Sequence, residues 1–230
     1  MAAGPRAERR LTVCVDDFGL HAGVNAAVLA LVGQGRVSAT SVLVDGLAWP
    51  EGAPLLRDAA GQGDGRRADV GLHVNFSEGL QPASVTGSAW QARPVSRLIA
   101  DAYARRLDPA ALHTEIERQW QRFEAHWGRP PDFVDGHQHV HQLPQIRDAL
   151  WAVIDARRAR LPAGFWVRDC GTSVLRQVRA GVPLVDAIKA GIISALGSGA
   201  IRRGAARRGL RVSKGLLGSY PFNRDVPGYL

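Results

Sequence analysis

Three of the seven histidines in this 230-residue chain stand at alternate positions in one short stretch, VDGHQHVHQLP (134–144). They are His137, His139 and His141. Alternation would place all three imidazoles on one face of a β-strand, whereas Gly136 and Pro144 favour a loop. Three histidines within five residues are hard to attribute to packing. We interpret the stretch as a functional cluster, for which a metal site and a catalytic relay both stay open.

Other polar residues follow predicted strands elsewhere in the chain. Asp16 and Asp17 come directly after LTVCV (11–15), His73 closes the run ADVGLH, and His137 follows DFVDG. Because the carboxyl ends of parallel strands meet at one rim, we expect these residues to converge. One carboxylate and two imidazoles suit a divalent ion of borderline hardness and leave positions open for water. Metal-assisted hydrolysis needs such an open site, since the ion acidifies bound water and polarises a carbonyl.

These residues also have structural interpretations. Adjacent aspartates after a strand often form a turn and a helix cap. A single histidine at a strand end, such as His73, is commonly a hydrogen-bonded structural residue. The DFG tripeptide at residues 17–19 also occurs in protein kinases, but no ATP-binding lobe could precede it and the chain has no HRD loop, which excludes that function. His113 and His126 fall on a predicted amphipathic helix, and we interpret them as surface residues.

Apolar runs alternate with longer helical patterns, which predicts an α/β fold with a mostly parallel sheet and one domain over residues 1–230. The predicted strands are 11–15, 37–44, 68–74, 132–135 and 165–169. The predicted helices are 23–35, 50–60, 108–128 and 144–159. The helix at 108–128 has the clearest signal, since Asp108 can cap it and Pro109 stands at its first position. Residues 76–105 show no period and are predicted as a long loop with short elements.

Composition narrows the class of protein. A hydrophobic fraction of 46% with 22% charged residues is typical of a folded globular chain. Cys14 and Cys170 stand far apart and form no C-x-x-C pair, which favours a reducing, cytoplasmic setting over a disulfide framework or a thiolate zinc site. The first ten residues hold no apolar signal region, and no run approaches the roughly 20 apolar residues of a membrane span. We therefore predict neither secretion nor membrane insertion.

The formal net charge of +8 raises a nucleic-acid-binding module as an alternative, since clustered Lys and Arg bind phosphate backbones. Only IRRGAARRGLRVSK (201–214) forms a basic run. The run has no interleaved aromatic residues, which disfavours single-strand binding. A solvated surface segment is the interpretation we prefer, and no nucleic-acid partner is expected.

Three stretches, taken together and in order, resemble a known family. VCVDDFGLHAGVNAAV, GLHVNFSEG and VDGHQHVHQLP are similar to the signature motifs of the YdjC-like carbohydrate deacetylases, a group that includes chitooligosaccharide and hopanoid-biosynthesis deacetylases. The resemblance extends from about residue 11 to about residue 225, because VRD near residue 168 and GSYPFNRD (218–225) also look like family sequence. It implies an irregular (β/α) barrel that acts as a metal-dependent N-deacetylase.

Carried over residue by residue, the resemblance assigns one divalent ion, zinc or magnesium, to Asp17, His73 and His137. Asp16 would be the general base that takes a proton from the metal-bound water. That water would attack the carbonyl of an N-acetyl group on an amino sugar, within an oligosaccharide or a lipid-linked glycan. The metal would stabilise the oxyanion, and acetate and an amine would be released.

The resemblance assigns no ligand role to His139 or His141, and four further residues are candidates for supporting roles. His139 and His141 would orient His137 or contact the substrate, since ligating imidazoles need partners on their second nitrogen. Asn75 and Arg168 would line the sugar site.

The chain departs from the family in one respect. Family members continue beyond GSYPFNRD into a strand with a His-Pro-Gly-like motif, whose histidine assists the leaving amine, whereas here no histidine follows His141. We therefore expect a barrel that is incomplete at its C-terminal end and a general acid that is supplied differently. A relative that binds metal or carbohydrate without turnover is an alternative function. A homodimer is compatible with the sequence.

Overall fold

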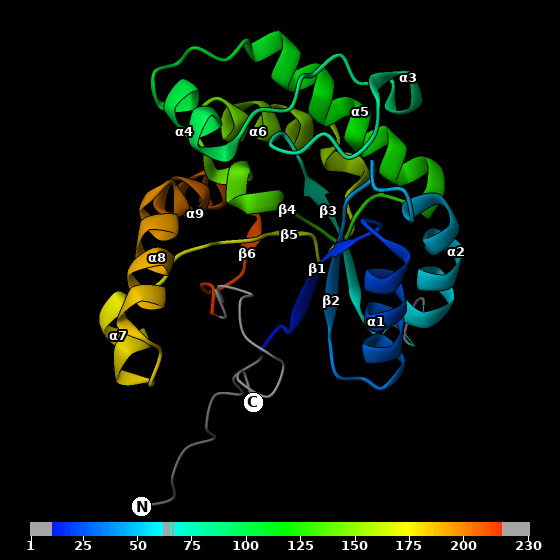
Figure 1. Ribbon diagram of the computed structural model, residues 1–230, viewed down its shortest axis with the longest axis horizontal. Coiled ribbons are helices and arrows are strands. Elements are labelled where there is room, and N and C mark those ends of the chain that lie inside the picture. The colour runs from blue at the N-terminus through cyan, green and yellow to red at the C-terminus, as the bar shows by residue number, and fades with distance from the viewer. Residues whose placement is uncertain (1–10, 62–64, 66, 218–230) are drawn as a thin grey trace, which may run out of the picture.

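The computed structural model describes residues 11–61, 65 and 67–217 and contains a six-stranded sheet with helices around it (Figure 1). The strands are β1 (Cys14–Phe18), β2 (Ala39–Val42), β3 (Asp69–Val74), β4 (Phe133–Gly136), β5 (Trp166–Val167) and β6 (Arg211–Val212). They neighbour one another in sequence order, and every neighbouring pair is parallel. The predicted α/β fold with a parallel sheet is confirmed.

Parallel strands in sequence order are the arrangement of a singly wound (β/α) barrel. In the part of the chain that the structure describes, no hydrogen-bonded ladder joins β1 to β6, so the sheet is open between these two strands. The stretch GSYPFNRD lies outside the described residues.

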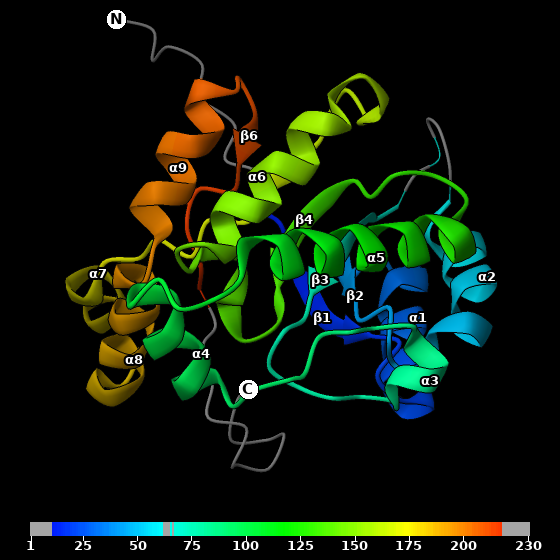
Figure 2. The same cartoon turned by 90° about the horizontal axis from the view of Figure 1, so that it is seen from above.

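Helices connect the strands and surround the sheet. They are α1 (Ala22–Gly33), α2 (Trp49–Ala60), α3 (Ala83–Thr86), α4 (Val95–Tyr103), α5 (Pro109–Trp127), the 3-10 segment η2 (His137–Gln142), α6 (Ile146–Ala156), the 3-10 turn η3 (Arg158–Arg160), α7 (Val174–Arg179), α8 (Leu184–Ala195) and α9 (Ser198–Arg207). In Figures 1 and 2, α1 and α2 lie together on one flank, and α7, α8 and α9 lie on the opposite flank.

The strongest helix signal is confirmed at both ends of α5. The Asp108 carboxylate accepts a hydrogen bond from the Ala110 N–H at 2.9 Å, and Gly128 ends the helix in a left-handed conformation, which glycine adopts without strain. The loop predicted over 76–105 contains only the short helices α3 and α4. The basic run at 201–214 forms the end of α9 and β6, where Ile201 and Ala205 are buried. Its basic side chains are exposed, as expected of a solvated surface, at Arg202, Arg203, Arg207, Arg211 and Lys214.

Alternation along the strands divides the sheet into an apolar face and a polar face. Leu72, Val134 and Val167 are fully buried in the hydrophobic core. The next side chain along each strand points to the opposite face of the sheet. On that face, His73 of β3 lies beside Asp135 of β4, because the two residues are paired in the register of the strands. The opposite face of the strands therefore carries polar groups that can meet across neighbouring strands.

The apolar side is held by aromatic packing between β1, α2 and α5. The buried indole of Trp49 stacks on Phe123 with 5.8 Å between ring centroids and meets Phe18 edge-on at 6.2 Å. Such aromatic pairs add to the stabilisation from burial. This packing fixes β1 against the helices and so fixes the position of the aspartates that β1 carries.

Candidate metal centre

The two aspartates lie inside the first strand and not after it, because β1 runs from Cys14 to Phe18 instead of over 11–15. The register with β2 shifts between Val15 and Phe18, so Asp16 and Asp17 together oppose one residue, Ser41. Asp17 has a φ of 67°, a left-handed conformation that aspartate tolerates better than most residues. The bulge breaks the alternation that would have sent consecutive carboxylates to opposite faces.

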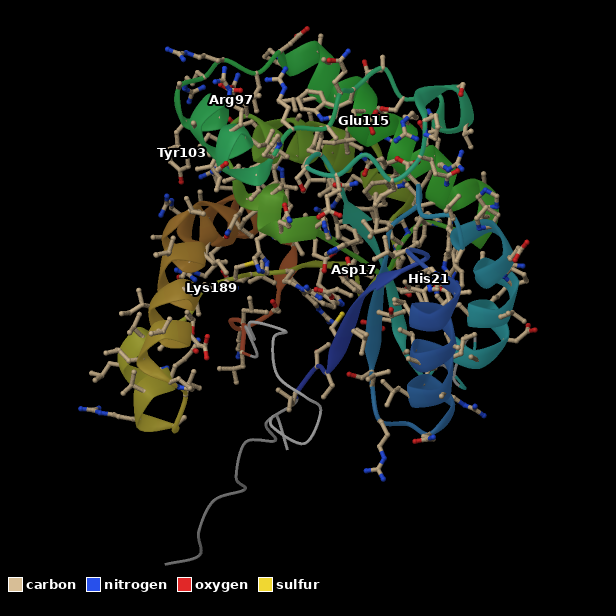
Figure 3. The ribbon with its side chains drawn as sticks, in the orientation of Figure 1. Asp17, His21, Arg97, Tyr103, Glu115 and Lys189 are labelled. Atoms are coloured by element: carbon tan, nitrogen blue, oxygen red, sulfur yellow. The ribbon has the colours of Figure 1, made fainter. Side chains whose placement is uncertain are left out.

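Asp17, His73 and His137 come together at this end of the sheet, each from a different strand or strand end. Their ligand atoms all lie within 4.8 Å of one another. Asp17 Oδ1 lies 3.0 Å from His137 Nδ1 and 3.3 Å from His73 Nε2. Figure 3 shows Asp17 in the middle of the molecule, at the end of β1. Since neighbouring ligand atoms in a tetrahedral zinc site are about 3.3 Å apart, the spacing fits a divalent ion.

Each of the two histidines turns its second ring nitrogen to a carboxylate. His73 Nδ1 lies 2.6 Å from Asp135 Oδ1, and both side chains are buried. His137 Nε2 lies 3.3 Å from Glu78 Oε1 and, among the described residues, makes no hydrogen bond. A carboxylate on the second nitrogen fixes the tautomer and the ring orientation of a ligating imidazole. The arrangement leaves His73 Nε2 and His137 Nδ1 facing Asp17.

Asp16 makes different contacts from its neighbour. The Arg168 guanidinium donates to both of its oxygens, at 2.6 Å to Oδ2 and 2.7 Å to Oδ1, and the Ser41 hydroxyl donates to Oδ1 at 3.1 Å. Arg168 also forms an ion pair with Asp135 at 2.9 Å. The buried Arg168 therefore links Asp16 to the carboxylate that orients His73, and it lies within the site as a positioning group.

Burial and neighbouring charges have opposite effects on the pKa of each ionisable side chain in this cluster. Burial would raise the pKa of Asp16, but Arg168 outweighs it and holds that pKa well below its usual range. Hydrogen bonds from His137 and His73 lower the pKa of Asp17 against burial in the same way. Burial would lower the pKa of His73, but Asp135 and the other aspartates raise it to about 10. The site thus favours a cation between its carboxylates.

His139 and His141 do not join the three clustered residues. His141 is fully buried and donates from Nε2 to the Arg168 carbonyl at 3.0 Å, which ties η2 to β5. His139 lies with Nδ1 3.5 Å from Cys170 Sγ. Burial lowers the pKa of both imidazoles to about 4. The alternating histidines do not share a strand face, because η2 is a 3-10 segment with left-handed residues at Gln138 and His139.

Asn75 closes the loop that carries Glu78. Its side-chain oxygen accepts hydrogen bonds from the N–H groups of Ser77 and Glu78, and its amide donates to the Glu78 carbonyl at 2.7 Å. The loop lines a pocket beside the three clustered residues, together with residues including Asp45, Gln81, Trp90 and Glu115. Asn75 therefore lies in the pocket wall, but its amide is used to hold the loop.

Sequence reasoning missed Asp135, Glu78 and Ser41 as parts of the site. The signal for Asp135 and Ser41 was present, because each precedes or follows a buried valine in its strand, Val134 and Val42, so alternation places both on the polar face. Glu78 lies within the quoted stretch GLHVNFSEG, but the loop that turns it back toward His137 has no local sequence period.

Gly136 is needed where β4 passes into η2. A Cβ at this position would lie 2.7 Å from the His141 backbone nitrogen and 2.9 Å from its Cβ. We expect Gly136→Ala to lower the free energy of unfolding by about 1–3 kcal/mol, because the strand and η2 must move apart. Gly164→Ala is the matched control, since a Cβ there meets nothing within 4 Å. Urea unfolding of both variants checks this, and equal stability would contradict the role of Gly136.

Comparison with known protein families identifies the family of this chain. A family model described as YdjC-like protein matches residues 10–225. The chain belongs to the YdjC-like family. The expected resemblance is confirmed, and the three clustered residues all fall within the matched range.

Two curated relatives in this family carry the name chitooligosaccharide deacetylase. The relative from Serratia marcescens is 32% identical over 65% of this chain and 57% of its own length. The relative from Escherichia fergusonii is 35% identical over 60% of this chain and 53% of its own length. The chain thus spans a little over half the length of the curated relatives it matches.

A solved structure supports the fold. The crystal structure of an Enterococcus faecalis protein, proposed to be a cellobiose-phosphate cleavage protein, superposes with a TM-score of 0.55 at 20% identity. The match covers 76% of this chain and 64% of the other.

In the described part of this chain, no single helix is long and apolar enough to cross a membrane. Only the bent pair α8 and α9, taken together, has the length and composition of a membrane span.

Proposed function

We propose that this protein is a metal-dependent hydrolase that removes the N-acetyl group from an amino sugar. The observation that carries the proposal is the convergence of Asp17, His73 and His137 within 4.8 Å, with a carboxylate on the second nitrogen of each imidazole. The names of the curated relatives support a carbohydrate deacetylase. The proposal includes the predicted cytoplasmic location.

Asp17 Oδ1, His73 Nε2 and His137 Nδ1 would hold the ion. The donor set suits zinc, which binds imidazole nitrogen and carboxylate oxygen. Magnesium is the alternative ion, because it prefers oxygen ligands and several carboxylates surround the site. When bound, a divalent ion would supply a Lewis acid that polarises the acetyl carbonyl and makes water more acidic. Asp135 would keep the His73 imidazole oriented for this purpose through its hydrogen bond, and Glu78 lies 3.3 Å from the second nitrogen of His137, where it can take the same role once the ion is bound.

Asp16 is proposed as the general base. Arg168 and Ser41 bind both sides of its carboxylate, so the carboxylate is ionised and its direction is fixed. A fixed and ionised carboxylate beside the three clustered residues would accept a proton from the attacking water at Oδ2, the oxygen that Ser41 leaves free. The pocket lined by Asn75, Glu78 and Trp90 is the proposed sugar site, where an indole can pack against a pyranose ring.

The substrate is tested by acetate release. Purified protein, loaded with zinc or magnesium, is incubated with N-acetylglucosamine oligomers of increasing length and with a lipid-linked N-acetylated amino sugar. We expect acetate and free amine in equal amounts from at least one of these substrates. Bound metal without any acetate release would instead identify a relative that binds without turnover.

Replacing the proposed base separates catalysis from metal binding. We expect Asp16→Asn to lower kcat by about 100-fold to 10,000-fold, the usual contribution of a general base, while about one ion per chain stays bound. Steady-state acetate release and metal analysis of the same preparation measure the two effects. Loss of the ion together with activity would instead make Asp16 a ligand.

A further inference from the structure

The flank formed by α7 and α8 exposes large apolar side chains. They are Leu175, Val178, Leu184, Val185, Ile188 and Ile192. In α8 the usual arrangement is reversed, because Ala187 and Ala190 are buried while Val185 is 77% exposed and Ile188 is 47% exposed. We define these six residues as the α7–α8 apolar face.

The apolar residues of α8 lie on one side of the helix. At 100° per residue, Leu184, Val185, Ile188 and Ile192 fall within about 100° of its circumference. The buried alanines lie on another side, against the molecule. Figure 3 shows side chains of α7 and α8 projecting outward from this flank, where Lys189 is labelled. A helix with large apolar residues outward and small ones inward has an unpartnered binding surface.

The segment 174–214, which contains α7, α8, α9 and β6, carries the whole net charge of the protein, and α7 and α8 contribute +2 of it through Arg176, Arg179, Lys189 and Asp186. Residues 174–214 hold nine Lys or Arg and one acidic residue, Asp186, so their charge is +8. The rest of the chain balances, with 20 basic and 20 acidic residues. Arg202 and Arg208 pair with Asp169 and Asp155. Among the described residues no ion pair involves Arg176, Arg179 or Lys189, which stand on the same two helices as the apolar face.

We propose that the α7–α8 apolar face docks the protein onto an anionic lipid surface. Apolar side chains flanked by unpaired Lys and Arg are what a helix lying in the headgroup region presents. A second copy of the chain would bring two faces of the same charge together, and nucleic acid would leave the six apolar residues without a partner. Charge and apolarity together therefore favour the anionic bilayer.

The docking face is joined firmly to the proposed active site. Gln142, in the η2 segment that begins with His137, donates from its side chain to the Ile193 carbonyl of α8 at 2.7 Å. The Tyr103 hydroxyl donates to the Leu196 carbonyl at 2.9 Å. These bonds hold the end of α8 against η2 and α4, so the face is carried by a fixed part of the molecule.

Vesicle co-sedimentation of the full chain tests the proposal. The vesicles are phosphatidylcholine alone, or equal parts of phosphatidylcholine and phosphatidylglycerol. We expect binding to the anionic vesicles only, weakened at about 0.5 M salt, where charges are screened within a few ångströms. No binding, or equal binding to both vesicles, would overturn the proposal.

Two sets of variants locate the surface. We expect Arg176→Gln/Arg179→Gln/Lys189→Gln to weaken partitioning by about 100-fold, since each basic residue near an anionic surface contributes severalfold. Val185→Ser/Ile188→Ser should weaken it at least about tenfold. Leu55→Ser and Arg36→Gln, exposed positions elsewhere, should have no effect. Unchanged vesicle binding in both sets of variants would overturn the assignment. It would also be overturned if the wild-type protein bound no vesicles but formed a concentration-dependent dimer, and Val185→Ser/Ile188→Ser abolished that dimer.

Discussion

Asp17→Asn is expected to remove both the bound ion and the activity. The substitution keeps the shape of the side chain but takes away the negative charge that faces His73 and His137 at 3.3 and 3.0 Å. Two neutral imidazoles and an amide hold a divalent ion poorly, because the ion loses its charged oxygen ligand. Loss of several kcal/mol of transition-state stabilisation corresponds to a fall in kcat/KM of about 1,000-fold or more. His137→Ala should have the same effect.

Metal content and acetate release, measured on the same samples, check this result. Two matched controls should retain one ion and full activity: Asp58→Asn, at an exposed aspartate on α2, and His113→Ala, at a half-buried histidine on α5. Asp17→Asn contrasts with Asp16→Asn, which is expected to keep the ion. If Asp17→Asn retained the ion and activity within about twofold, the three-residue centre would be wrong.

Asp135→Ala is expected to have the largest effect on stability. Asp135 is fully buried and contacts the His73 imidazole at Nδ1 (2.6 Å) and the Arg168 guanidinium at Nη2 (2.9 Å). Its removal leaves the Arg168 charge, which is also buried, with Asp16 as its remaining carboxylate. Breaking a buried ion pair by removing one partner costs about 3–5 kcal/mol. Metal affinity should also fall by about 10-fold to 100-fold, since His73 loses the group that orients it.

Urea unfolding and metal competition with a chelator measure these two effects. Asp148→Ala is the control, because Asp148 is an exposed partner of Arg147 and such surface pairs contribute about 1 kcal/mol or less. If Asp135→Ala does not fold, Asp135→Asn supplies the measurement, with a smaller loss. A change for Asp135→Ala no greater than that for Asp148→Ala would show that Asp135 does not hold the network together.

Much of the fold could be predicted from local patterns. The α5 helix is specified by Asp108, Pro109 and Gly128, and the central strands by short apolar runs. The convergence of Asp17, His73 and His137 could be predicted because parallel strands place their carboxyl ends at one edge. Their assignment as ligands followed from the resemblance to the family and stays a prediction.

The remainder depends on contacts between distant segments. The bulge that brings Asp16 and Asp17 to one edge is set by the pairing of β1 with β2, and no local residue specifies it. Glu78 reaches His137 only because Asn75 closes the loop between them. The sequence pattern predicts no helix in the segment 170–214, where the structure has α7, α8 and α9, since α8 buries its small residues and exposes its large ones, contrary to the usual amphipathic pattern.

Acetate release before and after metal removal tests the central claim most directly. The protein is treated with a chelator, assayed on N-acetylglucosamine oligomers, and assayed again after the addition of one equivalent of zinc or magnesium. We expect that chelation abolishes acetate release and that one equivalent of one of these ions restores it in the wild-type protein but not in Asp17→Asn. Acetate release that continues at the same rate in the metal-free protein would contradict it.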